Sequence, residues 1–469
     1  MKYLFFLFCA ISVNTFAQSE LLKPKWEVTT SGWYSSSEKT PFWVISNQYG
    51  RNKNTKNNTI ATIGLQASDS IGQLNFRYKI EGDARKTSSA NTYWAQEAWA
   101  EISYKSIYLM GGRRVDVFGI SDSLLSSGGS SWSANARPMP RLSIGTNDFI
   151  DIPFSNHTLS FRASLEHGWF EYNRYVRSPF LHHKNFYLRA VISKNYHVYW
   201  GIEHFAQWGG VSSDNKIGKL PSSFSDYIRV FTTQSGKSNN SALWTENANK
   251  LGNHLGGFHF GFDARFPSFI LLLYQQSFFE DGSGIGFKRK NRVDGVWGVS
   301  LQLPKQTFIN RIVYEYIHTA WQSGTFDGKN SVVGIGGLDN YYNNGIYQNG
   351  WTYYGNTIGN PFISSPELLG NTYGTINNRV TAHYLSFAGA IARGLEYQTK
   401  LSFSRNLGLY YAPFPKAKDQ FSFLLELMKT LPLKYKIKAG LQFAADRGDL
   451  LQKQYAIGFC VRANGLFCK

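Results

Sequence analysis

The segment SGGSSWSANARPMPRLSIGTNDFIDIPF, residues 127–154, interrupts the regular pattern of this 469-residue chain. Apolar and polar residues alternate on either side of it, whereas the segment itself is rich in small residues, prolines, arginines and aspartates. Pro138 and Pro140 fix φ and remove two backbone donors, so the ARPMPR core is predicted to be extended and to lie outside any sheet. We expect the rest of the chain to form an outer-membrane β-barrel, with this segment against its lumen or its periplasmic mouth.

The start of the chain predicts export. Lys2 is followed by an apolar run over residues 3–13, and a small residue, Ala17, precedes Gln18. This is the layout of a secretory signal peptide, and the apolar run is too short to span a membrane. We therefore expect residues 1–17 to be a signal peptide and residues 18–469 to be the mature barrel.

Alternation is clearest in the last quarter of the chain. In residues 395–405 the predicted outward set is Leu395, Tyr397, Thr399, Leu401 and Phe403. Residues 434–442 repeat the pattern, with Lys434, Lys436 and Lys438 on the polar face. Because a lysine near the middle of the lipid face costs about 2–4 kcal/mol, the three lysines are predicted to point inward.

The whole chain is predicted to be an all-β, transmembrane antiparallel barrel of about 18 strands. Aromatic residues make up 16% of the sequence and only 4 residues are Met, and no apolar window is long enough for a membrane helix. Plug segments that contain short helices are expected near residues 114–154, 211–253 and 323–381. One such helix is predicted over residues 221–232, where Ser223 and Asp226 have the spacing of a capping box.

The formal net charge of +18 restricts the partners. In an exported barrel this excess favours acidic surface polymers and the phosphates of lipopolysaccharide, because nucleic acid is not normally available there. We expect a monomer in contact with outer-membrane lipid. Cys460 and Cys468 either pair or remain two buried thiols.

No catalytic or metal-binding pattern stands out. His182 and His183 are adjacent, so in a strand they would point to opposite faces, and no nearby carboxylate pattern completes a metal site. We expect neither a cofactor nor enzymatic activity. An enzyme that assembles Ser and His from distant strands remains an alternative.

The segment DNYYNNGIYQNGWTYYGNTIGNPF, residues 339–362, concentrates aromatic residues among Asn and Gly. Aromatic faces stack on sugar rings and amides bond to hydroxyls, so the predicted polysaccharide contacts are Trp351, Tyr353, Tyr354, Tyr341 and Tyr342. The alternative is that these rings pack on one another or join the aromatic belt at the rim.

Arg137 and Arg141 are predicted to brace the plug through interior carboxylates such as Asp148 or Asp151. Their positions beside Pro138 and Pro140 would hold them in place.

Three short motifs, SANARPMPRLSIG (residues 133–145), EHFAQWGG (residues 203–210) and NGWTYYGNTIGNP (residues 349–361), resemble those of Wzi-type capsule assembly proteins in the form seen in Bacteroidetes-like bacteria. The resemblance covers essentially the whole mature chain. It implies a barrel plugged by a periplasmic-side helical element, acting as a lectin that tethers capsular polysaccharide at the cell outer membrane. A passive porin and an outer-membrane enzyme are the alternative functions.

Overall fold

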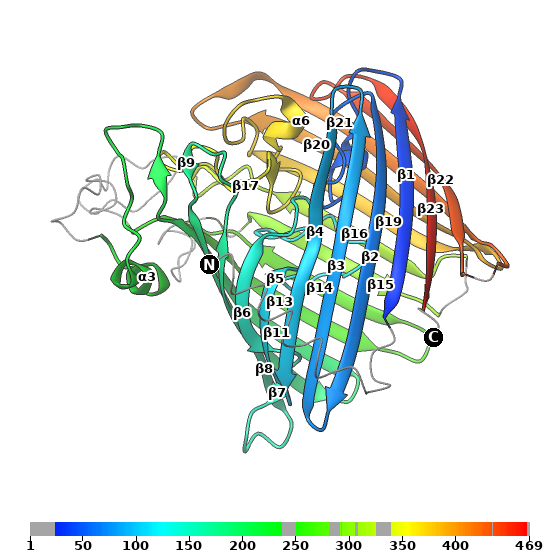
Figure 1. The fold of residues 1–469 in the computed structure, drawn as a ribbon, viewed down its shortest axis with the longest axis horizontal. Helices are drawn as coiled ribbons and strands as arrows, with labels where there is room; N and C mark the ends of the chain where they lie inside the picture. The colour runs from blue at the N-terminus through cyan, green and yellow to red at the C-terminus, as the bar shows by residue number, and fades with distance from the viewer. Residues whose placement is uncertain are drawn as a thin grey trace, which may run out of the picture.

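The computed structural model describes residues 24–236, 250–280, 291, 293–304, 308–324, 339–433 and 435–466. The expected signal peptide, Lys434 and Cys468 lie outside the described residues. The described chain forms a closed antiparallel barrel of 18 strands, as predicted, and β1 pairs with β23 to complete the ring (Figure 1).

The strands of the ring follow one another in chain order. They are β1 (Lys25–Ser35), β2 (Asn57–Ile71), β3 (Leu74–Thr87), β4 (Asn91–Tyr104), β5 (Ile107–Arg113), β6 (Pro140–Thr146), β8 (Leu159–Trp169), β10 (Phe180–Ser193), β11 (Tyr196–Trp208), β13 (Asn253–Arg265), β14 (Ile270–Ser277), β15 (Gly295–Gln302), β16 (Arg311–His318), β19 (Val380–Ala392), β20 (Leu395–Gly408), β21 (Pro413–Thr430), β22 (Lys438–Gly448) and β23 (Gln454–Leu466).

Short elements occupy the connections. They are β7 (Ile150–Asp151), the pair β9 (Val176–Arg177) and β12 (Val211–Ser212), the pair β17 (Thr352–Tyr353) and β18 (Asn356–Thr357), and the helices α2 (Phe42–Ile45), α3 (Phe224–Phe231) and α6 (Pro366–Leu369). Within the described ranges, no helix has the length and apolar character needed to cross a membrane.

The two ends of the barrel differ in the length of their connections. Turns such as residues 72–73 and 393–394 join strands at the end where β1 begins and β23 finishes, whereas residues 114–139 and 319–379 join strands at the other end. Outer-membrane barrels have short periplasmic turns and longer extracellular loops. The end that carries the long connections, uppermost around α6 in Figure 1, is therefore extracellular.

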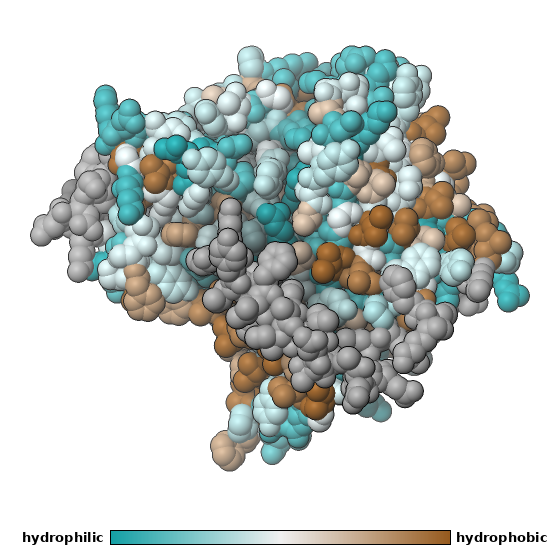
Figure 2. Space-filling model, in the orientation of Figure 1, coloured by the Kyte–Doolittle hydropathy of each residue, from teal (hydrophilic) through white to brown (hydrophobic). Residues whose placement is uncertain are grey.

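The wall alternates between apolar side chains outside and polar side chains inside. Leu441 and Phe403 are 65% and 50% exposed on the outer wall, whereas the hydroxyl of Ser402 accepts a hydrogen bond from the interior Trp43 Nε1 at 3.1 Å. Figure 2 shows hydrophobic surface on the wall and hydrophilic groups along the upper rim. The predicted facing of residues 395–405 agrees with this arrangement, because Lys400 also points inward, with Nζ 5.2 Å from the Trp43 ring centroid.

The prediction of a strand over residues 434–442 was partly wrong. β22 begins only at Lys438, which points inward and pairs with Glu396 at 2.8 Å. Lys436 lies in the preceding turn with φ of 45°, a left-handed conformation that breaks an extended strand. A backbone hydrogen bond from Leu431 N to Ile437 O at 2.8 Å closes this turn.

The segment that interrupts the alternation has three different parts. Residues 114–139 enter the lumen, where Trp132 and Met139 are 6% and 0% exposed. Residues 140–146 form the ring strand β6, so the prediction that the proline-containing segment stays outside the sheet was wrong there. Pro140 is the first residue of β6, a position where proline is tolerated because the ladder loses little without its N–H. Residues 147–158 form the periplasmic turn between β6 and β8, and this turn contains the short strand β7.

In the segment predicted as a second plug, residues 211–253, the helix lies outside the barrel. Its helix α3 begins after Ser223 with the predicted capping box to Asp226. In Figure 1 α3 lies beside the ring of strands, and its Tyr227 contacts His182. His182 faces outward because its neighbour His183 points into the lumen toward Glu166, so α3 covers the outside of the wall.

Candidate functional site

Interior ion pairs fix the 114–139 segment to the wall. The Arg141 side chain is 0% exposed and pairs with Glu166, Nε to Oε2 3.0 Å, and with Asp116. Asp116 also pairs with Arg114, 2.9 Å from Nε to Oδ1, and Arg114 in turn pairs with Glu101 of β4. A chain of opposite charges thus joins strands β4, β6 and β8 to the interior segment.

The predicted partners of Arg137 and Arg141 were wrong. Asp148 and Asp151 lie in the exposed 147–158 turn, where the Asp151 carboxylate pairs with His157. The whole of β6 separates this periplasmic turn from the interior segment, so neither carboxylate reaches the arginines.

Arg137 instead lies between aromatic rings. Its guanidinium carbon is 4.0 Å from the ring centroid of Trp94 on β4 and 4.9 Å from that of Tyr354. Burial, with the nearby Arg85 guanidinium, lowers the pKa of Arg137 to about 10. The cation still contributes to packing, because an arginine over an aromatic face is attracted by the ring quadrupole.

Most of the aromatic segment is buried. Trp351 is 0% exposed and donates from Nε1 to Ser131 O at 2.7 Å, and the Tyr341 hydroxyl donates to Asp294 Oδ2 at 2.8 Å. Tyr342 and Tyr353 are each 1% exposed. Trp351 and Tyr342 bind the 114–139 segment, and in this conformation none of the four side chains presents a ring face to a polymer outside the barrel. Their burial contradicts the predicted external sugar contact and matches the alternative that they pack on one another.

Tyr354 differs from its neighbours in being 41% exposed. Its backbone N–H donates to Glu171 Oε1 at 3.1 Å, which fixes the residue at the extracellular end. Of the predicted sugar contacts, Tyr354 is the one whose ring is available at the surface.

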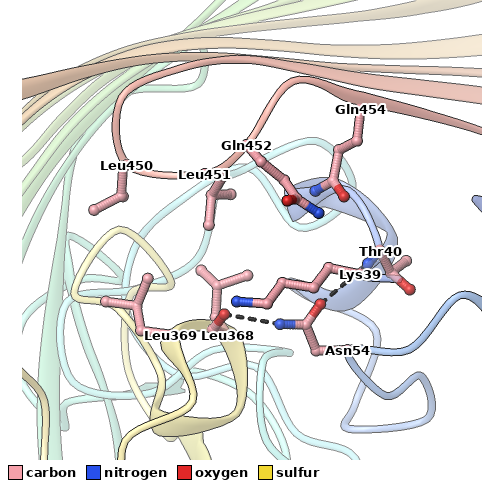
Figure 3. Close-up of a pocket in the computed structure, with 9 residues that line it drawn as sticks. All are labelled: Lys39, Thr40, Asn54, Leu368, Leu369, Leu450, Leu451, Gln452 and Gln454. Atoms are coloured by element: carbon pink, nitrogen blue, oxygen red, sulfur yellow. Dashed lines mark hydrogen bonds between the residues drawn. The ribbon is translucent and has the colours of Figure 1, made fainter. Parts of the chain in front are cut away.

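A small pocket opens at the extracellular end, with a volume of about 110 Å³ (Figure 3). Three segments far apart in the sequence meet there: the β1–β2 connection, the helix α6, and the connection between β22 and β23. Its walls combine amide, hydroxyl and ammonium groups with leucines, and the lining residues are Lys39, Thr40, Asn54, Leu368, Leu369, Leu450, Leu451, Gln452 and Gln454.

Asn54 connects two of these segments. Its side-chain amide donates to Leu368 O at 2.8 Å, and its Oδ1 accepts from the backbone N–H of Thr40 at 3.0 Å. The backbone N–H of Asn54 donates to Glu367 Oε1 at 3.1 Å, and the third segment is tied in by Gln454, whose Oε1 accepts from Ser37 Oγ at 2.6 Å. The pocket is therefore built into the fold.

Two pocket side chains are available to a ligand. Among the described residues, neither the Lys39 ammonium nor the Gln452 amide has a side-chain hydrogen bond or ion pair, and both residues are exposed. Figure 3 shows the Lys39 side chain extending across the pocket between Asn54 and Gln452. The pocket thus offers an ammonium, an amide donor and an amide acceptor above a leucine floor.

Tyr354 is linked to the same surface. Its neighbour Gly355 accepts, through its carbonyl oxygen, a hydrogen bond from Glu367 N at 2.9 Å, and Glu367 also pairs with Lys53. Leu368, the next residue of α6, lines the pocket. The exposed ring and the pocket therefore belong to one continuous part of the extracellular end.

Sequence reasoning missed the pocket residues. Lys39 and Gln452 lie among other polar residues in loops at opposite ends of the chain, and only the pairing of β1 with β23 brings them together. No local pattern marks either of them. Within the described ranges, no group of three or more His, Cys, Asp and Glu side chains could hold a metal ion.

The capsule assembly protein Wzi family matches residues 30–440. The chain belongs to the Wzi family. Among solved structures, it is similar to Escherichia coli Wzi at 14% identity and a TM-score of 0.59, over 94% of this chain and 85% of that one. That protein is described as an outer-membrane, carbohydrate-binding β-barrel involved in group 1 capsule assembly.

A second solved structure, Pseudomonas aeruginosa OccK5 (OpdH), is similar at 9% identity and a TM-score of 0.50, over 95% of this chain and 98% of that one. At these identities the similarity establishes the fold alone. Comparison with curated proteins gives no match. Family and fold together make this Wzi family member an outer-membrane β-barrel.

Proposed function

We propose that this protein binds capsular or another extracellular polysaccharide and attaches it to the cell surface, as a lectin-like barrel without catalytic activity. The observation that supports this most directly is the extracellular pocket with its free Lys39 and Gln452 side chains beside the exposed Tyr354. Membership of the Wzi family, and the carbohydrate binding described for the E. coli protein, point to the same ligand class.

The chemistry of the pocket suits a polymer of sugars with acidic groups. A pocket of about 110 Å³ is smaller than the roughly 300–1,000 Å³ that encloses a small-molecule ligand, so it would hold one end or one side group of the polymer. The Lys39 ammonium would pair with a carboxylate, the Gln452 amide would bond to hydroxyls in both directions, and Tyr354 would stack on a neighbouring ring. The net charge of +18 favours an acidic polymer further.

The outer-membrane location also suggests which lipids contact the protein and whether it is a monomer. Outer-membrane lipid would surround the wall, and the net charge of +18 would favour contact with lipopolysaccharide phosphates. The closed ring is complete within a single chain, which favours a monomer.

A binding experiment tests the proposal. The purified barrel is titrated with surface polysaccharide extracted from the strain that makes it, and compared with Lys39→Ala/Gln452→Ala and Tyr354→Ala. We expect at least tenfold weaker binding for the double variant and a smaller loss for Tyr354→Ala. Lys453→Ala is the matched control, because Lys453 is exposed beside Gln452 but does not line the pocket.

Two results would count against the proposal. Unchanged binding by the double variant would place the polysaccharide elsewhere on the barrel. No binding by the intact protein would reject the lectin function itself.

A further inference from the structure

The outer wall carries an unusual group of polar side chains near its extracellular end. His167, His182, His204 and His254 are on neighbouring strands and all face outward, as the cross-strand pairs His167–His182 and Ala206–His254 indicate. His204 and His254 bond to each other, Nε2 to Nδ1 2.8 Å. Lipid-facing polar groups are costly at membrane depth, so a barrel with this patch needs something to cover it.

The helix α3 provides that cover. The Tyr227 ring centroid is 5.8 Å from that of His167, 5.5 Å from that of His182 and 5.6 Å from that of Trp208. One turn later, the Phe231 ring lies 4.3 Å from the Lys184 ammonium, and Phe231 O accepts a hydrogen bond from it. Val230 is fully buried against Ala206 and Trp208 on the same wall.

The wall on the periplasmic side of this patch is apolar and exposed. Phe186, Trp200 and Phe260 are 38%, 37% and 39% exposed on the adjoining strands β10, β11 and β13. Figure 2 shows hydrophobic surface running from the place of α3 to the wall of the barrel. The helix therefore lies at the extracellular border of the lipid-facing band.

The sides of α3 that do not touch the wall differ from each other. Phe224 and Ile228 are 78% and 44% exposed, and their spacing of four residues places them on one side. Ser225, Arg229 and Thr232 follow on the next side of the helix. A helix with one side on the protein, one apolar side and one polar side is suited to the boundary between lipid and water.

We propose that α3 lies in the outer-leaflet interface, with Phe224 and Ile228 among lipid acyl chains and Ser225 and Arg229 toward the headgroups. The occupant of the exposed apolar side is thus outer-leaflet lipid. Continuity with the apolar wall favours lipid over a second protein, and Arg229 on the polar side of the helix would place a cation near the headgroup phosphates. The helix would fix the barrel's depth and rotation in the membrane on this side, independently of polysaccharide binding.

Site-specific fluorescence tests this placement in the full-length protein. Cys460 and Cys468 are replaced by Ser, and single cysteines at Phe224, Ile228 or Ser225 carry an environment-sensitive fluorophore. The assembled barrels are reconstituted in phosphatidylcholine vesicles. Quenching by doxyl-labelled lipid is then compared with quenching by aqueous iodide.

We expect labels at positions 224 and 228 to be quenched several-fold more by the doxyl lipid than the label at 225, and several-fold less by iodide. Equal iodide quenching at 224 and 225 would show that the helix faces water and would overturn the proposal. Protection of position 224 from both quenchers, together with a chemical cross-link between barrels, would assign the surface to a second copy of the chain and would also overturn it.

Discussion

Replacing Arg141, which is buried inside the barrel, is expected to destabilise the fold. Its side chain is 0% exposed, as is that of Glu166, and the two are paired at 3.0 Å. Removing one partner of a buried ion pair leaves the other charge buried and unpaired, which typically costs about 3–5 kcal/mol. We expect Arg141→Ala to lower the free energy of unfolding by that amount in urea titrations of the vesicle-inserted barrel.

The control is His157→Ala. Its ion pair with Asp151 is solvent-exposed, with the His157 side chain 87% exposed, and exposed pairs contribute at most about 1 kcal/mol. A loss for Arg141→Ala no larger than for His157→Ala would mean that the interior ion pairs do not hold the 114–139 segment.

For single residues, the sequence could indicate which side chains lie inside the barrel, but not which side chains they contact. Arg137 and Arg141 do lie inside the barrel, but the carboxylates expected to pair with them lie in a periplasmic turn. The carboxylates that do pair with Arg141, Asp116 and Glu166, lie on either side of β6 in the sequence, and only strand pairing places them together. The burial of Trp351 could not be predicted either, because an aromatic residue among Asn and Gly is compatible with a surface loop and with a hydrogen-bonded interior.

The facing of the strands can be tested at neighbouring positions of β22. Leu441 points outward and is 65% exposed, whereas Lys438 points inward toward Glu396. An arginine on the lipid face costs about 2–4 kcal/mol near the midplane. We expect Leu441→Arg to reduce the fraction of protein that folds into vesicles, measured by the heat-dependent shift in gel migration.

Lys438→Gln is expected to fold as well as the original protein, since it keeps a polar group on the inner face. Equal folding of both variants would show that the assigned facing of β22 is incorrect.

Elements with a single clear periodicity were predictable. The strand expected over residues 395–405 is β20, Leu395–Gly408, and the helix expected from Ser223 and Asp226 is α3. Predictions were less accurate where a local signal competed with tertiary structure. The prolines predicted that the ARPMPR core, residues 136–141, lies outside any sheet, yet Pro140 and Arg141 begin β6. Proline is tolerated there because it is the first residue of the strand. The face that α3 covers could not be read from the helix alone.

The packed interior makes a prediction about conduction. The 114–139 and 339–362 segments lie inside the ring with their large side chains buried, and Met139, Tyr341 and Trp351 are each 0% exposed. We expect planar-bilayer recordings of the intact protein to show little or no steady current. Replacing residues 118–135 with a short Gly-Ser linker should raise the current. Large ohmic steps from the intact protein would instead support the porin alternative.

Attachment of polysaccharide predicts a cellular effect. Deleting the gene should release surface polysaccharide into the medium without stopping its synthesis, and Lys39→Ala/Gln452→Ala should reproduce part of that release. The measurement is the ratio of cell-bound to free polysaccharide, with assembled barrel quantified in the same cells. Polysaccharide that stays cell-bound in the deletion strain would argue against attachment.

At the scale of the molecule, the alternation and the aromatic content predicted the fold class and the number of strands, because every strand repeats the same two-residue period. The position of the pocket could not be predicted in this way. It depends on which loops are neighbours at one end of a closed ring, and periodicity carries no information about that end.

The pairing of β1 with β23 also has consequences for the time course of assembly. Residues 25–35 pair with β2 on one side, but their partner on the other side is residues 456–466, so this second contact has almost the largest sequence separation that the chain allows. Contacts of this kind form slowly, and until then both edge strands expose unpaired backbone groups that can template aggregation. The nascent barrel therefore needs protection in the periplasm until its last strand arrives, and the seam between β1 and β23 is the place where insertion machinery has the most to contribute.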